Sequence, residues 1–278
     1  MSAPSQLPDL RIVPTNNLFL HEDVEPARVE RIAQRVQQDQ LLKNPVIVAE
    51  LGDGNHFVVL DGANRLTALK QLGVRDSLVQ VEDYGDPDVK LDTWYHLICD
   101  IDKHDLFARI GAVASLRLKA SDLSHARAAL AYHQIIAYMV CNDGDVHQID
   151  GPKDLSGRVT LLNRVAKTYK SNATIYRVQT DRIDELLSTY KNVAAVVVYP
   201  RFAPADILEL TRNDVKLPTG ITRHLIPRRA LRVNLPLSML AADKAIDEKN
   251  QWLHERISQM MRDGHIRYYQ ESTYLFDE

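Results

Sequence analysis

The first 85 residues alternate short apolar runs with amphipathic stretches. The apolar runs have the length and β-branched content of strands and cover residues 10–13, 45–49, 56–60 and 77–81. Gly52-Asp53-Gly54-Asn55 joins the second run to the third and favours a tight hairpin turn. Pro26 suits a first helical turn, and the apolar spacing after it predicts a helix that ends near Lys43. Residues 1–85 are therefore predicted to form a compact α/β unit.

The pattern changes twice beyond this unit. Residues 86–150 are predicted to be mostly helical, with an amphipathic stretch over residues 124–140, and the Asp- and Gly-rich residues 142–152 are the best candidate linker. Predicted strands then cover residues 173–178, 193–199, 230–235 and 266–275, and predicted helices cover residues 182–190, 205–211 and 241–261. The expected fold class is α/β to α+β, with three parts: an N-terminal domain (1–85), a helical connecting region (86–150) and a C-terminal α/β domain (151–278).

The most informative local pattern is a corner at residues 61–65, where an apolar run ends in Asp-Gly and helical spacing begins at once. A strand-turn-helix corner points several backbone N–H groups, the Asp61 carboxylate and the Arg65 guanidinium at one spot, which suits a phosphate. The alternative is an ordinary turn in which Asp61 caps the helix and Arg65 is solvated.

Composition limits the class of protein. With 278 residues, 45% of them hydrophobic, the chain has material for a sizeable core, and its net charge of -3 excludes a strongly basic chain of the kind that coats nucleic acid. A local basic patch covers residues 223–232. No apolar run approaches the roughly 20 residues that span a bilayer, and no signal peptide is visible, so a cytoplasmic protein is expected. Cys99 and Cys141 have apolar neighbours, which suits buried thiols.

The order of elements in the first 85 residues carries a resemblance. Strand, acidic loop, helix, Pro-headed strand, hairpin and Asp-Gly-X-X-Arg helix follow one another as in the ParB/sulfiredoxin-like fold. Known members of that fold bind nucleotide phosphates at this corner. The resemblance implies that residues 1–85 are a ParB/sulfiredoxin-like nucleotide-binding domain.

A longer ordered set of motifs extends the resemblance over most of the chain. The set consists of Leu20-His21-Glu22-X-X-Glu25-Pro26-X-Arg28, Thr93-Trp94-X-His96, Leu217-Pro218-X-Gly220-X-Thr222-Arg223 and Val233-Asn234-Leu235-Pro236-Leu237. It resembles the ParB-like free L-serine kinases, which include an enzyme that forms O-phospho-L-serine for siderophore biosynthesis. The resemblance implies phosphate transfer from ATP or ADP, with Mg²⁺, to the hydroxyl of free L-serine, in a cleft that the C-terminal domain closes.

Phosphorylation of a free hydroxyl requires a γ-phosphate held in place and an attacking oxygen in line with it. The resemblance places the phosphates at the corner residues, which are Asp61, Gly62, Ala63, Asn64, Arg65 and Thr67. Asn64 departs from the family, whose members carry histidine there. An amide donates a hydrogen bond but carries no charge, so either this phosphate contact is weaker or the nucleotide preference differs.

Glu22 is predicted to be the general base, and Asp61 is assigned to catalysis with it. A carboxylate opposite the phosphate accepts the proton that leaves the serine hydroxyl, and the family-like motif puts Glu22 in that role. The alternative for Glu22 is a solvated loop acid. Glu25 is the second candidate base, although a carboxylate just before Pro26 also favours a helix N-terminus.

A free amino acid needs its α-carboxylate recognised, and an arginine with small donors in a Gly-containing loop is suitable for this. Residues 219–224 offer this combination, and Thr222, Arg223 and His224 are predicted to bind the substrate. Trp94 and His96 are predicted to wall the same pocket. The alternatives are a surface turn for the loop and a core position for Trp94.

Other functions fit the sequence less well. A ParB-like nucleotide-dependent DNA-binding or transcriptional regulatory protein needs a basic recognition helix, and residues 120–140 carry few basic side chains. A sulfiredoxin-like reductase needs a reactive cysteine near the corner, and residues 22–90 contain none. No His or Cys stands out as a metal or haem ligand. The choice between ATP and ADP, the preference for serine over homoserine or threonine, and the oligomeric state stay open.

Overall fold

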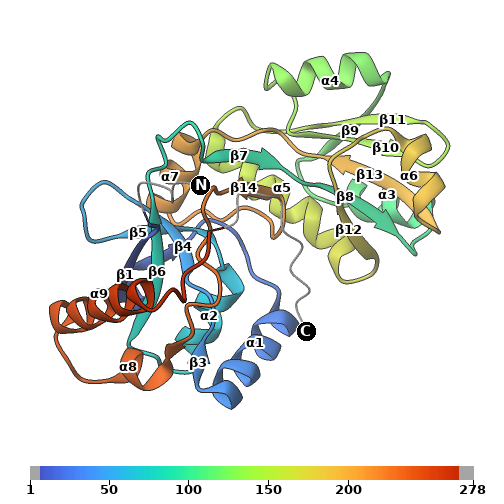
Figure 1. Ribbon diagram of the computed structural model, residues 1–278. Coiled ribbons are helices and arrows are strands. Elements are labelled where there is room, and N and C mark those ends of the chain that lie inside the picture. The colour runs from blue at the N-terminus through green and yellow to red at the C-terminus, as the bar shows by residue number, and fades with distance from the viewer. Residues whose placement is uncertain (1–6, 269–278) are drawn as a thin grey trace.

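The first sheet is formed by strands from residues 9–82 and organises the lobe that contains the N-terminal elements (Figure 1). The computed structural model describes residues 7–268. The sheet has five strands in the order β1 (Asp9–Pro14), β6 (Asp76–Glu82), β4 (Val46–Glu50), β5 (Phe57–Asp61) and β2 (Leu18–Leu20). β6 pairs with β4, and β5 with β2, in parallel, and the other neighbours are antiparallel. A short turn of 3-10 helix, η1 (Thr15–Asn17), separates β1 from β2.

Alternate residues of β4 and β5 enter different cores, which explains why these strands read as continuous apolar runs. Val46, Val48 and Val59 pack with Leu66 of α2 (Ala63–Gln71). Their neighbours Ile47, Ala49, Val58 and Leu60 belong instead to the core that continues into the second lobe. The end of β5, where Asp61 lies, is therefore fixed between α2 and the second lobe. α1 (Pro26–Asp39) packs against α2.

The C-terminal elements return to the first lobe. α9 (Ile246–Arg262) packs on β1, and β15 (Leu235–Pro236) pairs with β3 (Leu41–Leu42). α8 (Leu237–Ala241) lies between β15 and α9 in sequence and contacts β6. In Figure 1 the red α9 accordingly lies beside the blue N-terminal elements.

The second sheet is antiparallel throughout and has six strands. Their order is β12 (Thr174–Val178), β8 (Tyr95–Cys99), β13 (Val193–Val198), β10 (Ala137–Cys141), β11 (Val146–Asp150) and β9 (Arg117–Ser121). Helices cover both faces. The core cluster on one face includes residues of α3 (Lys103–Gly111), α5 (Leu155–Lys170) and α7 (Pro204–Arg212), and that on the other includes residues of α4 (Leu123–Ala131) and α6 (Ile183–Thr189).

A two-stranded ribbon lies between the lobes. β7 (Lys90–Thr93) pairs with β14 (Thr222–Leu225), so the predicted substrate loop lies alongside the segment that leaves the first sheet (Figure 1). The backbones of Glu22 and Leu217 form a parallel bridge that ties the loop before α1 to the segment before β14. This ribbon and bridge bring residues from both ends of the chain together.

The mixed α/β class and most elements of residues 1–85 are confirmed, whereas the mostly helical character of residues 86–150 is wrong. This region contains β7 to β11 and only α3 and α4. The amphipathic stretch over residues 124–140 begins as α4, but its end is β10, a central strand whose residues are all buried. A strand buried on both faces has no period-2 signal, so its apolar run extended the helical pattern. The predicted linker over residues 142–152 contains β11, the partner of β10. The division of the chain at residues 85 and 150 stays a prediction.

Other differences are local. Residues 230–235 do not form the expected strand, because Arg228, Arg232 and Asn234 all have positive φ and only Leu235–Pro236 pairs. Helix α5 was not anticipated. The first helix ends at Asp39, and the last long helix begins at Ile246. Residues 266–268 are not in a strand, and the rest of the strand expected over residues 266–275 lies outside the described residues.

Two expectations from composition can be compared with the fold. Cys99 and Cys141 are both buried and free, as expected. In the part of the chain that the structure describes, no helix has the length and apolar character needed to cross a bilayer.

Candidate active site

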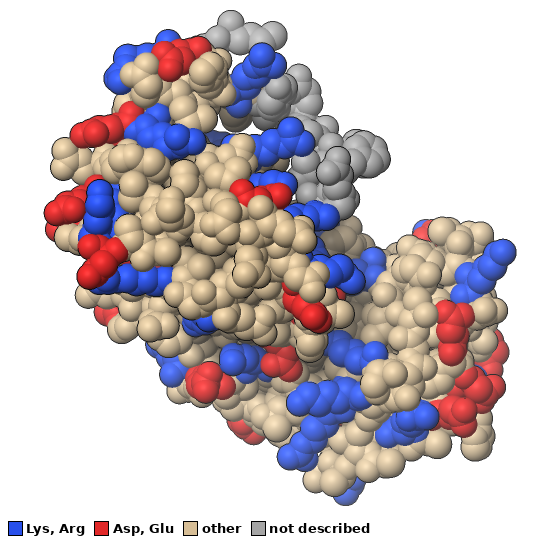
Figure 2. Space-filling view, turned by 90° about the horizontal axis from the view of Figure 1, so that it is seen from below, with Lys and Arg blue, Asp and Glu red and all other residues tan. Residues whose placement is uncertain are grey.

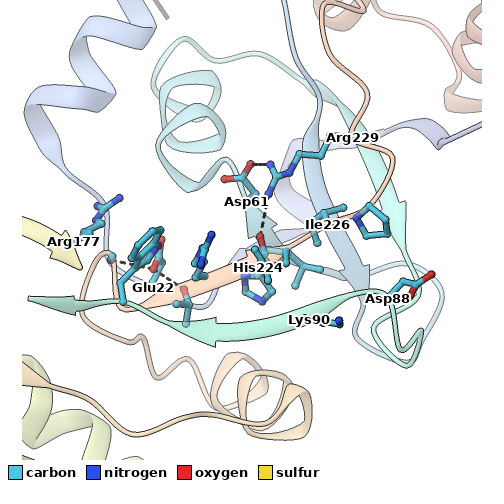
Figure 3. A pocket seen from close by; sticks show the side chains of 15 residues that line it. Glu22, Asp61, Asp88, Lys90, Arg177, His224, Ile226 and Arg229 are labelled. Atoms are coloured by element: carbon cyan, nitrogen blue, oxygen red, sulfur yellow. Dashed lines mark hydrogen bonds and ion pairs between the residues drawn. The ribbon is translucent and has the colours of Figure 1, made fainter. Parts of the chain in front are cut away.

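A pocket of about 810 Å³ opens where the loop before α1, the end of β5, β12 and the β7–β14 ribbon meet. Six of the predicted site residues line it, namely Glu22, Asp61, Trp94, Thr222, Arg223 and His224. Figure 3 shows Glu22 and Arg177 to the left of His224, and the Asp61–Arg229 pair above it. From below, the molecule is hollowed between its two lobes, and Lys and Arg side chains lie along this hollow (Figure 2).

Backbone pairing holds Glu22 in the pocket wall. The Leu217 N–H donates to the carbonyl of His21 at 2.8 Å, and the Asp23 N–H donates to the carbonyl of Leu217 at 2.9 Å. The Glu22 Oε2 accepts hydrogen bonds from the Gly220 N–H at 3.2 Å and from the Thr222 hydroxyl at 2.9 Å. Glu22 is therefore a fixed, half-buried acceptor and not a solvated loop acid.

Asp61 forms an ion pair with Arg229 in the pocket. Burial acts to raise the pKa of Asp61, but the charges of Arg229 and Arg65 outweigh it and hold that pKa below its ordinary value. The position that caps α2 belongs to Gly62, whose φ of 98° is left-handed. Asp61 thus does not cap the helix, and its charged carboxylate lies in the pocket wall, where it pairs with Arg229.

The other corner residues hold the corner together. The Arg65 Nη1 donates to the Pro45 carbonyl at 2.6 Å, and Gly62 is needed because a Cβ there would lie 2.8 Å from this nitrogen. The Thr67 hydroxyl donates to the Ala63 carbonyl of its own helix. The Asn64 Oδ1 accepts from the Glu25 N–H, just before α1. Among the described residues, those that line the pocket include none of these five corner positions, Gly62 to Arg65 and Thr67, so their contact with nucleotide stays a prediction.

The predicted substrate residues divide into pocket and core. The Arg223 guanidinium stacks on the Trp94 ring, 4.6 Å from its centroid, and both line the pocket. His96 is buried behind them and contacts the hydroxyls of Tyr169 and Tyr199 at 3.0 and 3.1 Å. It packs in the core and does not line the pocket, although it supports the strand that follows Trp94.

His224 is a neutral pocket group. Its Nε2 lies 2.8 Å from the Tyr84 hydroxyl, and its ring meets the His21 ring edge to face. Burial, reinforced by the neighbouring His21, lowers the pKa of His224 to about 3. His224 can therefore shape the pocket and exchange hydrogen bonds, but it adds no positive charge near neutral pH.

Sequence reasoning missed four charged residues that line the pocket: Asp88, Lys90, Arg177 and Arg229. Arg177 pairs with Glu25 and lies against Gly220. A Cβ on Gly220 would lie 2.3 Å from the Arg177 Nε, and Gly220 has a φ of +75°. Arg177 belongs to a strand in the second sheet, so only tertiary structure brings it to Glu22. Arg229 lay in the basic patch noted in the sequence, which was its only signal.

The pocket is rich in cations for its size. Lys90, Arg177, Arg223 and Arg229 line it. Behind them, the Lys170 Nζ donates to the Thr219 carbonyl at 3.0 Å, and burial lowers the pKa of Lys170 to about 8. Several cations around fixed carboxylates suit a site that holds two anions, such as a phosphate chain and a carboxylate.

Comparison with known proteins points to one kind of enzyme. No protein-family profile matches the chain. The chain is 23% identical over 275 residues to the ATP-dependent L-serine kinase SbnI of Staphylococcus aureus, which covers 97% of each chain. It is 20% identical over 239 residues to the ADP-dependent L-serine kinase SerK of Thermococcus kodakarensis, covering 85% of this chain and 95% of that one.

Solved structures agree with the sequence comparison. The fold matches a free serine kinase in complex with AMP with a TM-score of 0.72 at 17% identity, covering 85% of this chain and 95% of that chain. The resemblance predicted from the ordered motifs is thus confirmed. The chain resembles the free L-serine kinases along nearly its whole length and shares their fold.

Proposed function

We propose that the protein is a kinase that transfers phosphate from ATP or ADP to the hydroxyl of free L-serine and forms O-phospho-L-serine. The observation that carries the proposal is Glu22, fixed in the wall of a cation-rich pocket that the Asp61–Arg229 pair also lines. The names of the relatives support the substrate and the nucleotide. Use of the product in siderophore assembly stays a prediction.

Glu22 is the general base in this proposal. Its Oε2 holds two hydrogen-bond donors, so we assign the substrate proton to Oε1. The serine oxygen attacks the terminal phosphorus as its O–H bond breaks, and the proton passes to the carboxylate. Two anchored contacts keep the carboxylate from turning away, which is the positioning that in-line transfer requires.

The two anions of the reaction have separate cations. We assign the phosphate chain to the ParB/sulfiredoxin-like corner at the end of β5, where Arg229 pairs with Asp61, and Lys90 adds positive charge to the same pocket. Arg223, stacked on Trp94, is assigned to the α-carboxylate of serine, because a planar guanidinium matches that group. Arg177 holds the Gly220 loop and adds positive charge beside Glu22.

Magnesium fits this arrangement through Asp61. In proteins Mg²⁺ is commonly held by one or two carboxylates together with substrate phosphates, and Asp61 is a charged carboxylate at the phosphate corner. Between residues 7 and 268, no group of three or more His, Cys, Asp or Glu is arranged to hold a metal by itself. The ion would enter with the nucleotide and neutralise phosphate charge.

A DNA-binding role has less support. α4 lies within residues 120–140, the stretch considered for a recognition helix, and its Arg127 donates two hydrogen bonds to the Asp181 carboxylate at 2.8 and 2.6 Å. Arg127 is the one Lys or Arg side chain of α4, so this helix offers no cluster of cations for DNA phosphates. Nothing in the relatives' names favours this alternative.

The test is phosphate transfer from labelled ATP and from labelled ADP, with Mg²⁺, to serine, homoserine, threonine and other free amino acids, with products identified by mass. The proposal expects labelled O-phosphoserine from the wild type and at least 10²-fold less from Glu22→Gln. If no free amino acid yields labelled product, or if only amino acids other than serine do, the assignment of the substrate is overturned.

A further inference from the structure

A chain of hydrogen bonds runs from the first sheet through the pocket wall to Glu22. The His21 Nδ1 lies 2.6 Å from the Val59 carbonyl, and its Nε2 lies 2.9 Å from the Thr222 hydroxyl. The same hydroxyl lies 2.9 Å from the Glu22 Oε2. His21 is 2% exposed, so water does not replace these partners.

The number of protons in this chain is limited. A carbonyl only accepts, so the His21 Nδ1 carries a hydrogen and donates to Val59. In a neutral imidazole the other nitrogen, Nε2, is then an acceptor. Burial lowers the pKa of His21, which favours this neutral form. Thr222 therefore has one hydroxyl proton between two acceptors, the His21 Nε2 and the Glu22 Oε2.

The acceptor that the Thr222 proton chooses changes the basicity of the Glu22 carboxylate. A hydrogen bond donated to a carboxylate stabilises its charged form and makes it a weaker base. When the Thr222 proton turns toward His21, Glu22 loses a donor and attracts the substrate proton more strongly. When Glu22 then takes the proton of the substrate hydroxyl, no other hydrogen bond between His21, Thr222 and Glu22 has to form or break.

We propose that His21 is a positioning residue that acts on Glu22 through Thr222, by competing for the single Thr222 proton and so keeping Glu22 basic enough to deprotonate the substrate hydroxyl. The inference rests on the proposed function, in which Glu22 is the base. It assigns a task to a buried histidine that the transfer itself does not touch (Figure 3 shows Glu22 and its hydrogen bonds).

Other charged and titratable groups face this chain from neighbouring elements. Lys170 of α5 and Arg177 of β12 approach from the second lobe, His224 of β14 packs on His21, and Asp23 and Glu25 share its loop. Lys170, with a pKa of about 8, stays protonated on the acid side of the pH profile, and His224, with a pKa of about 3, stays neutral there. All five are unchanged in the variants below, so a comparison of variants removes their common contribution.

Two substitutions of His21 separate its two contacts. In His21→Asn the amide nitrogen takes the place of Nδ1 toward Val59, and nothing reaches Thr222. In His21→Gln the amide reaches the position of Nε2 and still accepts from Thr222. The proposal expects His21→Asn to move the acid limb of kcat/KM for serine to lower pH by about one unit and to reduce the plateau about tenfold, and His21→Gln to retain most of both.

The experiment measures kcat/KM for serine against pH at saturating Mg²⁺-nucleotide, in the wild type, His21→Asn, His21→Gln, Thr222→Val and the double variant His21→Asn/Thr222→Val. His147→Asn, a half-buried histidine on β11, is the matched control. Circular dichroism and thermal unfolding establish that each variant folds. The proposal expects that His21→Asn no longer moves the acid limb once Thr222 is valine.

Two results would overturn it. If folded His21→Asn keeps the wild-type acid limb, His21 does not act on the base. If it moves the limb equally with and without the Thr222 hydroxyl, the effect does not pass through Thr222. In both cases the wild type still makes O-phosphoserine, so the proposed function survives. Failure of the wild type to phosphorylate serine is a different outcome and removes the function itself.

Discussion

The backbone of Glu22 pairs with Leu217, which holds this residue in the pocket wall. One oxygen of its side chain accepts two hydrogen bonds. Glutamine can accept the same two hydrogen bonds, so we expect Glu22→Gln to fold normally and to bind nucleotide with unchanged affinity. Without a basic carboxylate, turnover should fall about 10²-fold or more. Steady-state rates at saturating serine and calorimetry with nucleotide check both parts. Near wild-type turnover would mean that Glu22 is not the base.

Asp61 and Arg65 were expected to act alike, but their contacts differ. Asp61 is charged and lies in the pocket, whereas Arg65 donates to the Pro45 carbonyl and packs against Gly62. We expect Asp61→Asn to weaken binding of Mg²⁺-ATP and Mg²⁺-ADP with little change in thermal stability. Arg65→Ala should lower thermal stability, because it removes support beneath the corner. Calorimetric titration and thermal unfolding separate the two, and equal stability losses would show that Asp61 is structural.

Arg223 tests which lobe holds the amino acid. Loss of a charge-assisted contact to the serine carboxylate is worth about 1.5–3 kcal/mol, so Arg223→Ala should raise KM for serine roughly 10- to 100-fold. Arg223→Lys should recover only part, because a point charge does not reproduce the planar fork or its stacking on Trp94. Serine and nucleotide are titrated separately in each variant. Loss of nucleotide affinity with normal serine saturation would move the residue to the phosphate side.

At the scale of elements, the Gly220 loop connects the second lobe to Glu22. Its left-handed backbone lets the Gly220 N–H reach Glu22 while Arg177 lies against the missing side chain. Gly220→Ala should therefore displace the loop and reduce kcat/KM for serine roughly tenfold or more. Gly144→Ala is the matched control, since Gly144 also has positive φ but has open space where a Cβ would be. The control should lose some stability and keep its activity, and a similar activity loss in both variants would show a general backbone effect.

Elements with local signals could be predicted from the sequence. The hairpin at residues 52–55, the corner at Asp61 and the helix after Pro26 all depend on glycine, proline and short-range spacing, and the structure contains them. β10 could not be separated from the helix before it, because a strand buried on both faces lacks the alternation that marks an exposed sheet. Positive φ at Arg228, Arg232 and Asn234 also has no reliable sequence signal.

The pocket residues also divide into those with a local sequence signal and those that only the tertiary structure brings to the site. The ordered motifs led to Glu22, Thr222 and Trp94, because each belongs to a run of residues with recognisable spacing. Arg177 is isolated in an ordinary strand, and it reaches Glu22 only because β12 lies at the edge of a sheet from the other lobe. Long-range juxtaposition of this kind is a property of the fold. His96 belongs to the motif Thr93-Trp94-X-His96, but it lies in the core, where it contacts the hydroxyls of two tyrosines.

At the scale of the whole molecule, α9 ties the end of the chain to the first sheet through a buried ion pair. Lys249 is 0% exposed and donates to Asp76, which is 1% exposed on β6, and also to the Leu240 carbonyl. Two charges without water are tolerated because each satisfies the other. Removal of one partner leaves the other charge buried without compensation.

Lys249→Met should accordingly lower the free energy of unfolding by about 3–5 kcal/mol, measured by urea denaturation at neutral pH. Because neither Lys249 nor Asp76 lines the pocket, the folded fraction should keep its KM for serine and for nucleotide. Lys249→Met with Asp76→Asn should regain part of the loss, since the uncompensated charge is gone. Arg75→Ala is the control: its pair with Asp243 is exposed, and loss of an exposed pair changes stability little. Equal losses from Lys249→Met and Arg75→Ala would mean that burial does not set the strength of these pairs, and that α9 is held by its apolar face alone.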